Sequence, residues 1–169
     1  MADVRIEHIY NCDPDTVWDK FFFDAEYNTR LFKEGLKFPA YEQIKFEETD
    51  TEIRRSVEVT PELGPMPGPL KKLIGDGLGY REDGVFNKAT KRYKLTITPN
   101  KMADKVTITG EMWMEPKGDG KSNRVFTCSV NAKIFGVGGM LEKKTIEDMK
   151  KSYEVGAEFT NKYIAEKGL

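Results

Sequence analysis

The sequence predicts an α+β fold, in which an antiparallel sheet of about seven strands packs against one long C-terminal helix. Three observations carry this prediction. Apolar and polar residues alternate at period two between residues 39 and 134, the last 30 residues return to a helical period without proline, and two short helical segments follow the first strand. A chain of 169 residues has the size of one ordinary domain, so we expect a single domain over residues 1–169.

Seven segments alternate at period two and are predicted to be strands. They span residues 3–10, 41–48, 52–60, 78–86, 91–99, 105–115 and 124–134. Short polar connections, such as Asn87-Lys88, separate the later strands, which is typical of antiparallel neighbours in a meander. The third and fourth strands are separated by residues 64–79, where eight of sixteen residues are Gly or Pro, so we expect an irregular loop there.

Two short helices are predicted after the first strand. Asp13 is a favourable N-cap residue, and Pro14 takes the first helical position, where its missing N–H costs nothing. Asp24 caps the second helix, which covers residues 25–34 and ends at Gly35. Both segments carry apolar residues at helical spacing.

The C-terminal helix is predicted over about residues 140–166, preceded by a glycine-rich turn at residues 136–139. Its inward stripe is formed by Leu141, Thr145, Met149, Ser152, Gly156, Phe159 and Tyr163. Three of these, Thr145, Ser152 and Gly156, are small where a tightly packed helix would carry Leu or Ile. Small residues that face a sheet leave volume unfilled, so the stripe indicates a cavity beneath the helix.

The inventory of charged and reactive groups excludes several classes of protein. The 27 basic and 28 acidic residues nearly cancel, which argues against a nucleic-acid binder that depends on a positive field. His8 is the only histidine, and Cys12 and Cys128 fit no metal-binding spacing, so we expect no metal and no cofactor. The charged first ten residues do not resemble a signal peptide, and no run reaches the ~18 apolar residues of a membrane helix. We therefore expect a cytoplasmic location with reduced cysteines.

The order of these elements resembles the helix-grip fold of the START-like superfamily, which includes lipid-transfer domains, birch-pollen allergens, polyketide cyclases and Hsp90 activators. VRIEHIYNCDPDTVWDKFFFDAEY looks like the opening strand and helix of that superfamily, and IFGVGGMLEKKTIEDMKKSYE looks like its last strand and helix. Together with GPMPGPLKKLIG, these segments resemble an uncharacterised bacterial START-like family of unknown function. The resemblance covers the whole chain. It implies a curved sheet wrapped around the C-terminal helix, with a cavity between them.

We expect the cavity to bind an apolar ligand, with most of its wall apolar and with few polar anchors. The predicted ligand-binding residues are His8, Arg55, Tyr93, Met112, Met114, Thr145, Met149, Ser152 and Gly156. In the alternative interpretation, the large side chains of Tyr93, Met112 and Met114 fill the volume beneath the helix and leave no cavity.

Two polar residues lie on predicted buried faces. His8 is either a hydrogen-bonded core residue or a cavity group that binds a ligand hydroxyl or transfers protons. Arg55 must be paired, reach solvent at a strand end, or anchor the carboxylate or phosphate of a ligand. We name both residues as the predicted polar anchors.

The loop of residues 64–79 is a candidate gate, with Met66, Leu70, Leu73 and Ile74 as its apolar residues. Leu70, Leu73 and Ile74 lie on one side of a helical turn, so they could also make transient contact with a membrane surface. The alternative is a plain surface loop packed by its own apolar side chains.

The sequence thus predicts a protein that binds, and in one version transports, an apolar small molecule such as a lipid, sterol or polyketide-like compound. Two alternatives stay open. The first is a cyclase or dehydratase that uses the same cavity and needs a titratable group there. The second is a protein-interaction module of the Hsp90-activator type, which a filled interior and a large exposed apolar patch would favour. The poor catalytic inventory favours a binder over an enzyme, and no obligate protein partner is evident. The identity of the ligand is not encoded in any motif.

Overall fold

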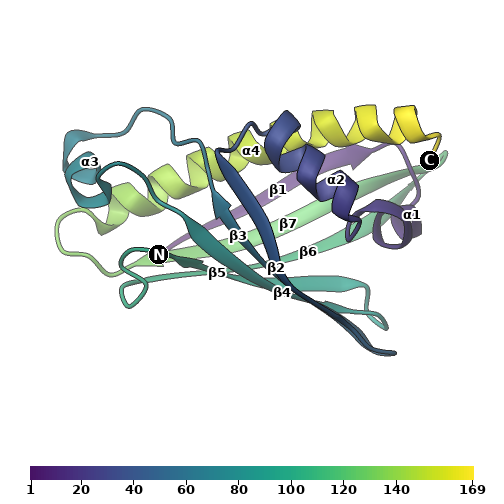
Figure 1. Ribbon diagram of the computed structural model, residues 1–169, viewed down its shortest axis with the longest axis horizontal. Coiled ribbons are helices and arrows are strands. Elements are labelled where there is room, and N and C mark those ends of the chain that lie inside the picture. Colours follow the sequence, from purple (N-terminus) through teal and green to yellow (C-terminus); the bar gives the residue numbers. More distant parts are fainter.

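A computed structural model describes residues 1–169 and shows one seven-stranded antiparallel sheet in the order β1-β7-β6-β5-β4-β3-β2 (Figure 1). The strands are β1 (Ala2–Tyr10), β2 (Ala40–Glu48), β3 (Glu52–Thr60), β4 (Tyr80–Asn87), β5 (Arg92–Pro99), β6 (Val106–Gly118) and β7 (Lys121–Ala132). The predicted strands and the predicted meander are confirmed. β1 joins the meander by pairing with β7, so the first and last strands are neighbours.

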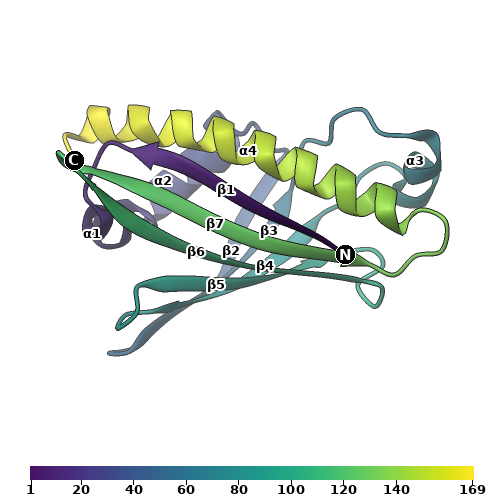
Figure 2. The same cartoon turned by 180° about the vertical axis from the view of Figure 1, so that it is seen from behind.

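The helices occupy the positions that the sequence predicts. They are α1 (Pro14–Thr16) with its π-helical continuation η1 (Val17–Phe21), α2 (Ala25–Arg30) with its continuation η2 (Leu31–Gly35), α3 (Gly68–Ile74) and α4 (Gly138–Lys167). α4 runs along one face of the curved sheet, directly over β1 and β7 (Figure 2). α3 lies at the end of the molecule where α4 begins, and α1 and α2 lie toward the opposite end (Figure 1). The predicted α+β helix-grip architecture is confirmed.

The short helices are held by local hydrogen bonds and by proline. Asp24 accepts the backbone N–H of Tyr27 at 3.0 Å, which satisfies one of the free donors at the start of α2. Asp13 occupies the N-cap position of α1, but its side chain makes no capping hydrogen bond there. Pro14, with its fixed φ, therefore contributes more to the start of α1 than Asp13 does.

The turn from β7 into α4 depends on glycine. Gly136 has a φ of 79°, in the region that favours glycine, and a Cβ at Gly138 would collide with the carbonyl oxygen of Ala132. Glu142 then accepts the backbone N–H of Ala132 at 2.9 Å, and this hydrogen bond lowers the pKa of its carboxyl group. These contacts fix the angle at which α4 leaves the sheet. At its other end, α4 stops at Gly168, which is left-handed with a φ of 67°.

Two glycines on the inner face of the sheet make room for aromatic rings. A Cβ at Gly84 on β4 would collide with the ring of Tyr93 on β5. A Cβ at Gly110 on β6 would lie 2.8 Å from the ring of Phe126 on β7. Both rings are fully buried, at 1% and 0% exposure, so they cannot swing aside. The glycines let Tyr93 and Phe126 lie against the sheet instead of filling the space below α4.

We predict that Gly84→Ala destabilises the protein by about 1–3 kcal/mol, because the added methyl group overpacks Tyr93. Gly139→Ala is the matched control, since no atom lies within 4 Å of the added Cβ. Its stability should be unchanged or slightly raised, because alanine favours the helix. The midpoints of urea unfolding measure both changes. Equal midpoints for the two variants would contradict the role assigned to Gly84.

Candidate ligand-binding cavity

A cavity of about 250 Å³ lies between α4, the inner face of the sheet, the α2–η2 segment and the loop of residues 61–78. Of the 33 residues around it, 20 are hydrophobic. The sheet contributes large apolar side chains, among them Leu95, Ile97, Ile108 and Met112. The interior is therefore not completely filled by the residues of β5 and β6.

α4 presents both apolar and polar residues to the cavity. Thr145, Met149, Ser152, Gly156 and Thr160 line the cavity. The hydroxyls of Thr145 and Thr160 each donate to a backbone carbonyl one turn earlier, at 2.7 Å. Because this hydrogen bond is internal to the helix, Thr145 needs no polar partner in the cavity, whereas the hydroxyl of Thr160 also bonds the hydroxyl of Tyr27 at 2.7 Å.

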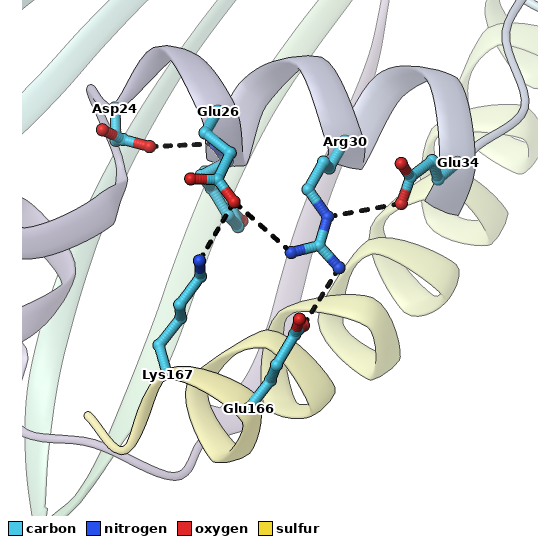
Figure 3. Close-up of polar contacts among 7 residues, drawn as sticks. Asp24, Glu26, Arg30, Glu34, Glu166 and Lys167 are labelled. Carbon is cyan, nitrogen blue, oxygen red and sulfur yellow. Dashed lines mark hydrogen bonds and ion pairs between the residues drawn. The ribbon is translucent and has the colours of Figure 1, made fainter.

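The α2–η2 segment forms a second wall and is fastened to the end of α4 (Figure 3). Arg30 binds Glu166 at 3.0 Å, and Lys167 binds Glu26 at 3.0 Å. These contacts raise the pKa of Arg30 and of Lys167 and lower the pKa of Glu26, as expected for charge-assisted hydrogen bonds. Gly35 permits the close approach, since a Cβ there would lie 2.9 Å from the ring of Phe159.

The predicted gate segment forms a third wall. Met66 and Ile74 line the cavity together with Leu78. Leu70 is 0% exposed and belongs to the main core, while Leu73 is half-buried and lies away from the cavity. The predicted helical turn is therefore the two-turn helix α3, whose apolar side packs inward. In this conformation Leu70 and Ile74 are not available at the surface.

Arg55 is buried beneath Phe22 and Phe23, the two residues that follow η1, and pairs with a carboxylate. Its guanidinium lies 3.5 Å from Glu82 and 3.4 Å from the hydroxyl of Tyr93, and it also donates to Asn28 and to the carbonyl of Phe22. Burial alone would lower the pKa of Arg55. The interactions with Tyr93 and Glu82 outweigh the effect of burial, so the pKa of Arg55 is raised. Tyr93 donates in turn to Glu82 at 2.9 Å, and burial raises the pKa of this phenol. The cluster is close to neutral overall.

A second arginine, Arg124 on β7, also lines the cavity and is 5% exposed. It donates to the hydroxyl of Tyr10 at 2.7 Å and to the backbone carbonyl of Tyr153 at 3.2 Å. Its Nη2 lies 2.8 Å from Nδ1 of His8. Because a guanidinium can only donate, Nδ1 of His8 is the acceptor, and the neutral imidazole carries its proton on Nε2.

The structure brings seven of the nine predicted ligand-binding residues together at the cavity and leaves two of them out. The predicted residues that line the cavity are Arg55, Tyr93, Met112, Thr145, Met149, Ser152 and Gly156. His8 and Met114 do not line it; His8 faces Arg124, and Met114 packs against both core clusters. The sequence analysis did not single out Arg124 and Glu82, although both lie at inward positions of their strands, in phase with Phe126 and Phe86.

Other reactive groups lie outside this arrangement. Burial raises the pKa of Cys12 to about 11 and that of Cys128 to about 12, so both thiols are poor nucleophiles. No group of three or more His, Cys, Asp or Glu side chains is arranged to hold a metal ion. None of the helices combines the length and the apolar composition needed to cross a membrane.

The family described as "protein of unknown function (DUF2505)" matches residues 5–164. The chain belongs to this family. No curated protein matches it. Among solved structures it is similar to a protein from Thermus thermophilus, with a TM-score of 0.69, 16% identity, and coverage of 99% of this chain and 100% of that one.

Two named enzymes share the fold. One is the Zhui aromatase/cyclase from a Streptomyces species, with a TM-score of 0.66, 11% identity, and coverage of 96% and 95% of the two chains. The other is norcoclaurine synthase from Thalictrum flavum, solved with dopamine and hydroxybenzaldehyde, with a TM-score of 0.62, 13% identity, and coverage of 94% and 85%. At such low identity these likenesses establish the START-like fold, as the sequence predicted, and nothing about a shared reaction.

We predict that the protein loses stability as the pH falls below about 6.5, and that His8 is the cause. Burial and then the charge of Arg124 lower the pKa of His8 from its ordinary 6.5, while Glu154 opposes them. A group with a lowered native pKa resists protonation in the folded state, so the unfolded chain binds more protons in this range. His8 contributes its full stabilisation at pH values above the pKa that it has in the unfolded chain. This contribution declines as the pH falls toward the lower pKa that His8 has in the folded protein.

His8→Gln should remove this decline between pH 7 and 5.5, because the amide oxygen still accepts from Arg124 but does not titrate. Urea unfolding at several pH values measures the slope for both proteins. Since His8 is the only histidine, its single imidazole signal in NMR also reports its pKa directly. An identical slope in both proteins, or an NMR pKa at or above 6.5, would refute this assignment.

Proposed function

We propose that the protein binds a compact apolar molecule in the cavity beneath α4, with the whole chain acting as one binding unit. The observation that carries this proposal is the cavity itself, which lies between α4, the sheet, the α2–η2 segment and residues 61–78 and is surrounded mainly by hydrophobic residues. Transfer of apolar ligand surface into it would contribute roughly 25 cal/mol per Å². The polar groups at Arg55 and Arg124 would set the orientation of the ligand.

The cavity volume of about 250 Å³ limits the size of the ligand. Sites for drug-sized ligands measure about 300–1,000 Å³, whereas a cavity of about 150 Å³ holds benzene. The present volume therefore suits one or two rings or a short chain better than an intact diacyl lipid. A sterol would require one wall to move outward, and the segment of residues 61–78 is our candidate for that movement.

The solved structures support a compact aromatic ligand as one version of this proposal. The named partners in the norcoclaurine synthase structure, dopamine and hydroxybenzaldehyde, each contain a single ring. A cyclase-type activity is the second candidate, because Glu82 and Tyr93 place an ionisable pair at the wall of the cavity. Turnover of an aromatic or polyketide-like substrate that stops on Glu82→Gln would support that candidate over simple binding.

Three further predictions from the sequence have less support. A protein-interaction module calls for a filled interior, and the large exposed apolar side chains are scattered, as at Ile44, Phe135 and Met140. Membrane contact through α3 would require Leu70 and Ile74 to turn outward from their buried positions. The cytoplasmic location remains a prediction from composition.

We predict that Ser152→Leu weakens binding of 2-naphthalenemethanol at least about tenfold, because three added carbons occupy space that a two-ring probe needs. Its stability should be unchanged or higher, since the added carbons fill volume rather than displace packed atoms. Lys151→Leu is the matched control, the same new side chain on the exposed side of α4. Isothermal titration calorimetry measures binding of the uncharged probe to each protein.

Native mass spectrometry of the purified protein complements this test by detecting any small molecule that co-purifies with it. No binding of the probe by the wild-type protein, with no co-purified molecule, would count against the proposed function. Equal weakening by both leucine variants would count against the position of the site.

A further inference from the structure

Arg124 is a buried positive charge without a negative partner. All of its contacts are neutral, namely the hydroxyl of Tyr10, Nδ1 of His8 and the carbonyl of Tyr153. The ion pairs of the protein do not include it, and its side chain is 5% exposed on the cavity wall. A buried charge is ordinarily paired, because leaving water without compensation is costly.

The other cations on the cavity wall are already neutralised. Arg55 has Glu82 at 3.5 Å, and Lys144 binds Asp148 at 2.7 Å, one helical turn away on α4. Glu154, which favours the charged form of His8, is exposed and makes no contact with Arg124. Of the three cations on the wall, Arg124 is therefore the one without an anionic partner; Glu62, also on the wall, is exposed and pairs with none of the three.

The guanidinium also has hydrogen-bonding capacity left. It carries five N–H donors, and its three hydrogen bonds use one on Nη1 and two on Nη2. Nε is buried and has no hydrogen-bond partner. The rings of Tyr10 and Tyr153 lie 5.1 and 4.6 Å from the guanidinium carbon, so the group is held in place by stacking. A fixed guanidinium with free donors suits a carboxylate or a phosphate.

We propose that Arg124 is the anchor for an anionic group on the molecule that occupies the cavity. The ligand is then an amphiphile, with a compact apolar body beneath α4 and a carboxylate or phosphate ester against Arg124. This inference rests on the proposed function, since it assigns the polar end of the same ligand. The proposal gives the two arginines different roles, because Arg55 belongs to a neutral cluster and Arg124 binds the anionic group of the ligand.

The test compares three probes with the same two-ring body: 2-naphthoate, 2-naphthyl phosphate and the uncharged 2-naphthalenemethanol. Wild-type protein should bind at least one of the anions about tenfold or more tightly than the alcohol, as expected for hydrogen bonds to a charged group. A preference for one anion identifies a carboxylic acid or a phosphate ester as the ligand class. Equal affinity for the two anions indicates that Arg124 recognises anions in general.

Substitutions locate the charge that produces the preference. Arg124→Gln should remove it while the alcohol still binds, and Arg124→Lys should retain part of it. Lys144→Gln is the matched control, because it removes another cation of the cavity wall that is already paired; the preference should persist. If Arg124→Gln does not fold, the wild-type protein still gives an answer. The NMR signal of His8 should then shift on binding of the anion and stay in place on binding of the alcohol.

The failures of the two proposals are distinguishable. Binding of the alcohol as tightly as both anions overturns the assignment of Arg124 and leaves the proposed function intact. If Lys144→Gln and Arg124→Gln lose the preference for anions equally, the preference arises from the overall electrostatic field of the cavity. This result also overturns the role assigned to Arg124. No binding of any of the three probes contradicts the proposed function itself.

Discussion

One helix cannot cover a sheet of seven strands, and the rest of the structure follows from this mismatch. Strands lie about 4.8 Å apart, so the sheet measures roughly 29 Å across, whereas a helix with its side chains is about 10–12 Å wide. α4 lies over β1 and β7, which leaves the inner faces of β3, β4 and β5 uncovered. These faces are mainly apolar, apart from the paired Arg55 and Glu82, and the α2–η2 segment and the segment of residues 61–78 close over them. The cavity is the space that this closure does not fill.

The polar residues of the interior fall into two groups with different electrostatic states. Arg55 has an anionic partner in Glu82 without any ligand, and Tyr93 bonds both residues, although Nε of Arg55 has no hydrogen-bond partner. Arg124 is held by neutral acceptors and by two aromatic rings, which position its charge without cancelling it. Hydrogen bonds offset part of the free-energy cost of burying this charge. An anion bound to Arg124 would offset the part of that cost that the hydrogen bonds leave. The difference between the two arginines is therefore one of partners rather than of burial.

Periodicity was sufficient to predict the elements of the fold, since most strands and helices have a clear apolar face, although β2 is almost entirely exposed. It also placed Arg55 on an inner face and the small residues of α4 over a cavity. It could not show which inward residues reach the cavity, because that depends on where α4 crosses the sheet. His8 and Arg124 are paired across β1 and β7, yet only Arg124 reaches the cavity wall. The sequence likewise could not show whether Leu70 is buried, because its burial depends on α3 packing inward against the core.

The fastening of the α2–η2 wall has a consequence for its response to solvent. The wall is held to α4 by exposed ion pairs, such as Arg30 with Glu166, and by apolar packing of Gly35 on Phe159. Dissolved salt screens the first kind of contact over about 8 Å at physiological strength, and strongly hydrated anions such as sulfate reinforce the second. Sodium chloride therefore weakens mainly the ion pairs, whereas ammonium sulfate weakens the ion pairs and strengthens the apolar contact. Ion identity, and not ionic strength alone, sets how firmly this side of the cavity is shut.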